Sequence, residues 1–111
     1  MTGHPAVTSI DALAPDLLAE ARSHASRRAA RTLVSGTSQR ATLIALSDGA
    51  ELAEHDSPPA ATLYVVSGTV RLHSHSEEWT LQRGHLATIP PERHGLTALG
   101  DVVVLLTVAL H

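Results

Sequence analysis

The chain has no cysteine and no phenylalanine, and it contains a single tryptophan and a single tyrosine. Without cysteine it has no disulfides, no thiolate metal ligands and no thiol nucleophile. With so few aromatic residues, the core of these 111 residues must be aliphatic, and a chain of this length suits one domain. The formal net charge is −3, which disfavours a nucleic-acid partner on electrostatic grounds.

Long apolar runs are also missing. The longest, residues 102–110, is interrupted by Thr107 and is too short to span a bilayer. Residues 1–9 lack the basic and apolar regions of a signal peptide. These absences predict a cytoplasmic protein with no membrane partner.

The first part of the chain has helical periodicity. Apolar residues recur at helical spacing from Ile10 to about Ala25, which predicts an amphipathic helix over these residues. Pro15 is best tolerated in a first turn, so the regular helix is expected to begin near it. We therefore expect a leader and helix over residues 1–27, followed by a different structure over residues 28–111.

Residues 28–111 consist of short alternating segments separated by turn residues, among them Gly49, Gly68 and Gly84. About nine strands without intervening helices predict an all-β, mainly antiparallel sandwich or barrel. The expected strands are residues 29–34, 40–46, 51–55, 62–66, 69–73, 79–82, 86–89, 96–99 and 102–108.

The spacing of glycine and histidine forms a first recognisable motif. Gly49 is followed by five residues and then His55, and Gly68 lies thirteen residues further on. This resembles the first motif of the cupin superfamily, G-x5-H-x-H-x3,4-E-x6-G. Ser57 stands where that motif has its second histidine, and Ala61 where it has glutamate.

A second motif follows at the spacing that cupins show. Gly84 and Pro90 match G-x5-P-x-G-x2-H-x3-N, whereas Glu92 replaces the glycine and His94 arrives one residue early. The resemblance covers residues 40–110 and implies a cupin-type β-barrel, or jelly roll, with one N-terminal helix. It also implies that His55 and His94 approach one another inside the barrel.

The cupin ligand set binds Mn, Fe, Ni or Zn through imidazoles and a carboxylate. Alternate residues of a strand share a face, so an H-x-H pair delivers two imidazoles into the barrel. Here the corresponding positions hold His55, Ser57 and Ala61, which leaves the set incomplete. A third ligand could come from His85 or from a carboxylate, which would supplement His55 and His94 as metal ligands.

Other candidate residues have ordinary structural interpretations. His73 and His75 follow the apolar residues Val70 and Leu72, and alternation places both histidines on the outer face. Tyr64 is expected to point outward, under the helix or at a dimer contact. Trp79 is expected to serve packing or an interface.

Three functions remain open at this point. The first is a cupin that binds a small molecule in its barrel through His55, Ser57 and His94. The second is a metal-dependent enzyme of the dioxygenase or isomerase type, and the third is a structural or regulatory dimer without chemistry. The apolar segment 102–108 and the outward Tyr64 predict a homodimer.

Overall fold

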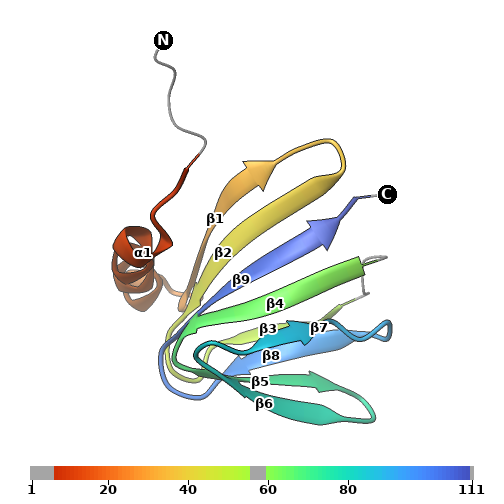
Figure 1. Cartoon of the computed structure of the whole chain (residues 1–111). Coiled ribbons are helices and arrows are strands. Elements are labelled where there is room, and N and C mark those ends of the chain that lie inside the picture. Colours follow the sequence, from red (N-terminus) through yellow and green to blue (C-terminus); the bar gives the residue numbers. More distant parts are fainter. Residues whose placement is uncertain (1–6, 56–59, 111) are drawn as a thin grey trace.

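The computed structural model describes residues 7–55 and 60–110, and at Glu54 and His55 it describes the backbone. Within these residues, one helix and nine strands form a flattened barrel of two facing sheets (Figure 1). The predicted all-β, antiparallel fold with one helix is confirmed. The elements are α1 (Ile10–Ser23), β1 (Arg28–Ser35), β2 (Gln39–Leu46), β3 (Glu51–His55), β4 (Ala60–Ser67), β5 (Thr69–Ser74), β6 (Glu78–Gln82), β7 (Leu86–Thr88), β8 (His94–Ala98) and β9 (Val102–Ala109).

The two sheets have different sizes. The five-stranded sheet has the order β1-β2-β9-β4-β7, and the four-stranded sheet has the order β3-β8-β5-β6. Every pairing is antiparallel. The chain crosses between the sheets at short turns, such as Gly68 between β4 and β5 and the turn between β8 and β9. Gly49, Gly68 and Gly84 all have positive φ, and the prediction that they lie in turns is confirmed.

Helix α1 begins earlier than its proline suggested. Ser9 caps it, accepting a hydrogen bond from the backbone N–H of Ala12 at 3.3 Å. The helix starts at Ile10, as the apolar periodicity predicted, but Pro15 lies inside it and not in a first turn. A good cap and a buried apolar face outweigh the missing N–H of one proline. The helix ends at Ser23, before the expected end near Ala25.

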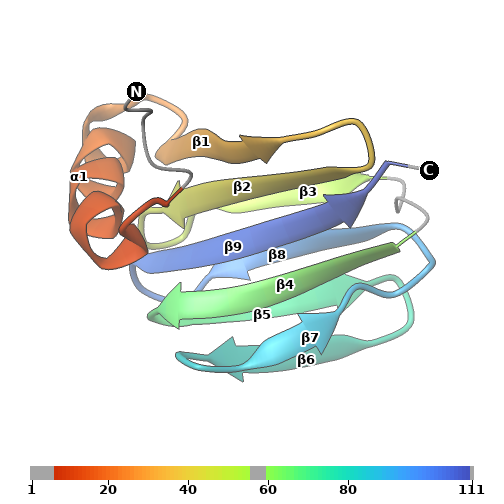
Figure 2. The same ribbon diagram turned by 45° about the horizontal axis from the view of Figure 1, so that its top comes forward.

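Two apolar clusters share the five-stranded sheet. The inner cluster fills the space between the sheets, and in β2 it receives Ile44 and Leu46. The outer cluster packs α1 against the opposite face, and it receives Leu43 and Ala45 from the same strand. Strand alternation therefore divides β2 between two cores. Figure 2 shows the helix lying over one end of β1, β2 and β9.

An ion pair joins the helix to the turn between β8 and β9. The Arg22 side chain donates to the Asp101 carboxylate through Nε at 2.9 Å and through Nη2. The backbone N–H of Asp48 donates to the other carboxylate oxygen at 2.9 Å. Two hydrogen bonds lower the pKa of Asp101 below its usual value: the one from Arg22 has the larger effect, and the one from the Asp48 N–H the smaller. The helix, the β2–β3 turn and the β8–β9 turn thus meet at one carboxylate.

The described part of the chain contains no helix that is long and apolar enough to cross a membrane.

Candidate functional site

The candidate site centres on His94, the first residue of β8. Leu96 and Ala98 of this strand belong to the inner core. His94 has the same parity, so it shares their inward face, and it is only 3% exposed. The sequence predicted a strand over residues 96–99. Because β8 starts two residues earlier, His94 belongs to the wall of the barrel.

A backbone carbonyl determines the tautomer of His94. The ring Nδ1 lies 3.2 Å from the carbonyl oxygen of Glu92. A carbonyl can only accept, so Nδ1 carries the proton of this hydrogen bond. In the neutral ring Nε2 then holds a lone pair, and it can accept a hydrogen bond or bind a metal ion.

Ser74 lies beside His94 on one neighbouring strand. It is directly opposite His94 in the β5–β8 ladder, and it is buried. Its hydroxyl oxygen accepts the backbone N–H of Glu77 at 3.2 Å and so supports the turn that follows β5. Sequence analysis missed Ser74, although the alternation of Val70, Leu72 and Ser74 marked it as inward-facing.

His55 lies on the other neighbouring strand. Its backbone pairs with that of His94, while Leu52 pairs with Leu96. Three steps along β3 therefore match two steps along β8, which is the register shift of a β-bulge. Simple alternation from the partly buried Leu52 would have brought Glu54 into this position. The bulge brings the backbone of His55 opposite His94 instead.

Ser57 and Ala61 stand at the two replaced cupin ligand positions. Ser57 lies outside the described residues. Ala61 is buried on the inner face of β4 and belongs to the core. Its methyl group offers no ligand atom, so the position of the cupin glutamate here contributes only apolar surface.

His85 is far from the other candidates. Its carbonyl accepts the N–H of Val65 near the end of β4, and its Nδ1 accepts the N–H of Gln82 at 2.9 Å. The chain turns at Gly68 and runs back along β5 to Ser74, which pairs with His94 at the opposite end of the barrel. His85 is exposed and cannot share a ligand with His94. The structure therefore does not bring His85 next to His94 as a third nitrogen ligand.

His73 and His75 have the expected orientation. Val70 and Leu72 are buried, whereas His73 is half-buried on the outer face, with Nε2 3.1 Å from the Thr97 hydroxyl. His75 is exposed, 3.9 Å from a Glu92 carboxylate oxygen. The other Glu92 oxygen accepts the Ser76 hydroxyl at 3.1 Å. This surface cluster covers the outside of the turn whose backbone holds His94.

The described residues do not fit a complete metal centre. Among residues 7–53 and 60–110, no three side chains of histidine, aspartate or glutamate come together. Ala61 supplies no carboxylate at the position of the cupin glutamate, and His85 lies at the end of the barrel opposite His94. His94 is the one histidine that this part of the chain buries on an inward face of the barrel.

The sole tryptophan faces the same interior. Trp79 of β6 pairs with Leu72 of β5 and packs against the inner core. Its expected packing role is confirmed. Tyr64, by contrast, is 41% exposed on the outer face of β4 and pairs with the exposed Leu86 of β7. The helix does not cover it, which leaves an interface as its remaining predicted role.

Comparisons with known proteins identify the fold. No protein-family model and no curated protein matches the sequence. Among solved structures, a conserved protein of unknown function from Streptococcus pyogenes is 26% identical, with a TM-score of 0.70 over 78% of this chain and 76% of that one.

Two cupins are similarly close in structure. A cupin superfamily protein from Desulfitobacterium hafniense has a TM-score of 0.71 and 13% identity over 76% of this chain and 78% of that one. An RmlC-like cupin from Shewanella frigidimarina has a TM-score of 0.69 and 21% identity over 76% and 77%. The chain is a small protein with the cupin fold.

Proposed function

We propose that this protein binds a small molecule inside its barrel, at the end where β8 begins. The observation that carries the proposal is a buried histidine on a largely aliphatic strand face: His94 is 3% exposed and shares its face with Leu96 and Ala98. Ligand pockets typically combine apolar walls with a few convergent polar groups, and His94 is such a group on this wall.

The chemistry of the two histidines indicates the kind of ligand. With Nδ1 of His94 donating to the Glu92 carbonyl, Nε2 of the neutral ring is an acceptor. A ligand hydroxyl, amide or amine would donate to it. His55, whose backbone is paired with His94, would supply the second polar contact, and Ser57 a third. The aliphatic side chains of the inner core would contact the apolar part of the ligand.

Elemental analysis separates this function from a metal-dependent enzyme. The protein is purified without a histidine tag, and Fe, Mn, Ni and Zn are measured. We expect less than stoichiometric metal. Near-stoichiometric metal would overturn the metal-free binder and favour the enzyme, with His55 and His94 joined by a further ligand.

A second measurement separates a binder from an inert barrel. The purified protein is denatured, and the released small molecules are analysed by mass spectrometry. Trp79 reports on the same interior, because it is the only tryptophan and packs against the inner core. We expect a released compound that restores the native Trp79 fluorescence when it is added back to stripped protein.

Two histidine variants show whether the compound lies at the predicted place. His94→Ala should lose the compound, whereas His85→Ala removes an exposed imidazole at the opposite end and should retain it. Each variant must first show a wild-type far-ultraviolet spectrum. Retention of the compound by a folded His94→Ala variant would place binding elsewhere on the chain, and absence of any compound would favour the inert dimer.

A further inference from the structure

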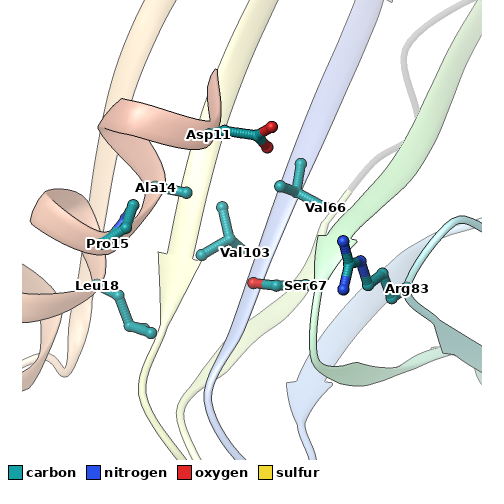
Figure 3. A pocket seen from close by; sticks show the side chains of 8 residues that line it. All are labelled: Asp11, Ala14, Pro15, Leu18, Val66, Ser67, Arg83 and Val103. Carbon is teal, nitrogen blue, oxygen red and sulfur yellow. The ribbon is translucent and has the colours of Figure 1, made fainter. Parts of the chain in front are cut away.

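A groove lies between the helix and the five-stranded sheet, along the edge of the outer cluster and at the end of the barrel opposite His94. Its volume is about 320 Å³, near the lower end of the range for small-molecule sites. Figure 3 shows side chains from α1, from the ends of β4 and β9, and from the β6–β7 turn. The lining residues are Asp11, Ala14, Pro15, Leu18, Val66, Ser67, Arg83 and Val103.

The walls of this groove carry opposite charges. Asp11 lies on the helix side and Arg83 on the β4 side, with Val66 and Val103 between them (Figure 3). Within the described part of the chain, neither charged side chain makes a hydrogen bond or an ion pair. Two other charged residues of the helix do form long-range ion pairs: Arg22 with Asp101 and Glu20 with Arg31. The groove thus presents one free anion and one free cation across an apolar floor.

Two irregularities of the backbone meet at the same groove. Pro15 inside α1 cannot donate to the carbonyl of Asp11, as the residue at this helical position normally does. Val66 is the extra residue of a β-bulge, because Val65 pairs with Val104 and Ser67 with Val103. Departures from local regularity in natural proteins are expected chiefly at functional or strained sites.

We propose that this groove binds a short zwitterion whose ammonium and carboxylate groups are separated by an apolar chain, such as an ω-amino acid. The carboxylate pairs with the Arg83 guanidinium and the ammonium with the Asp11 carboxylate. The methylene chain lies over Val66 and Val103. A molecule with a single charge satisfies one wall only, and an α-amino acid holds both charges on one carbon and does not span the floor.

The site is independent of the barrel interior. Val66 and Val103 belong to the outer cluster beneath the helix, whereas His94 shares its face with the inner core. Binding here therefore does not depend on the proposed function of His94, and each can fail without the other.

The experiment uses the full ¹⁵N-labelled chain and 6-aminohexanoate as the probe. Amide shifts are followed as the probe is added, with hexanoate, hexylamine and glycine as comparison ligands. Two exposed charge contacts, together with partial burial of the methylene chain against the valine floor, predict a dissociation constant on the order of 1 mM. We expect saturable shifts centred on Val66, Ser67 and Arg83, and binding at least about fivefold weaker for the three comparison ligands.

Charge variants test the two walls. Asp11→Asn and Arg83→Gln should each weaken 6-aminohexanoate about fivefold, the loss of one exposed charge pair. Asp16→Asn and Arg40→Gln are matched controls, because both residues are exposed and neither lines the groove. The double reversal Asp11→Lys with Arg83→Glu should restore much of the binding that each single reversal abolishes, since the probe can turn around.

Three results would overturn the proposal. The first is the absence of saturable shifts at ten times the expected dissociation constant. The second is equal binding of hexanoate, hexylamine or glycine, which would mean that the paired, spaced charges are irrelevant. The third is a shift pattern centred on other residues, or equal losses in the groove variants and their controls. A well-dispersed amide spectrum of each variant verifies that it is folded.

Discussion

Two turn glycines allow the effect of available space on stability to be measured separately from backbone conformation. Gly68 and Gly84 have nearly the same backbone angle, φ of +83° and +87°. A Cβ at Gly84 would meet nothing within 4 Å, whereas one at Gly68 would overlap the carbonyl oxygen of Asp101 and lie 2.9 Å from the Cα of Val102. The atoms in the way are backbone, so they cannot swing aside as a flexible side chain would.

The expected destabilisation follows from these two surroundings. Gly84→Ala introduces only the strain of a side chain at positive φ, roughly 1–2 kcal/mol. Gly68→Ala adds the displacement of the β8–β9 turn, at roughly 1–3 kcal/mol for an overpacked site. We therefore expect Gly68→Ala to be about 2 kcal/mol less stable than Gly84→Ala.

Urea denaturation followed by Trp79 fluorescence measures this difference, because Trp79 leaves the inner core on unfolding. With a slope of about 1–2 kcal/mol/M, the unfolding midpoints of the two variants should differ by about 1–2 M. Equal midpoints would refute the reasoning, since they would mean that the close approach of Gly68 to the β8–β9 turn adds nothing to the conformational strain.

Further outcomes are expected at the helix, the ion pair and the exposed sheet face. Leu17→Ala should destabilise the protein by about 2–4 kcal/mol in the same urea assay, because Leu17 is completely buried between α1 and the sheet; a loss below about 1 kcal/mol would contradict that packing. Asp101→Asn should lower the free energy of unfolding by up to about 1 kcal/mol at pH 7, the range of a partly exposed pair. The folded pKa is lowered, so this contribution is present above the unfolded value near 3.9 and is lost as pH falls through the folded pKa; a difference between Asp101→Asn and wild type that grew below pH 4 would be the wrong sign. We expect a homodimer through the paired, exposed Tyr64 and Leu86; light scattering should show a dimer for wild type and a monomer for Tyr64→Arg, and a monomeric wild type at high concentration would refute it.

Local features of the sequence were sufficient to predict the elements of the fold. Strand alternation and turn glycines depend on residues close together in the chain, so the nine strands were predicted with small errors at their ends. The place of Pro15 inside the helix was not predicted, because the cap at Ser9 and the buried face around Leu17 outweigh the effect of the proline.

The sequence by itself thus determined a small aliphatic antiparallel barrel with an N-terminal helix and histidines near its strand ends. Only the tertiary structure decided which residues meet. The bulge in β3 brings the backbone of His55 opposite His94, and the run of β5 separates His85 from both. Likewise, Asp11 and Arg83 line one groove although 71 residues separate them in the chain. Strand periodicity specifies the face on which a residue lies, but the register between strands and the packing of the helix arise from contacts between distant segments.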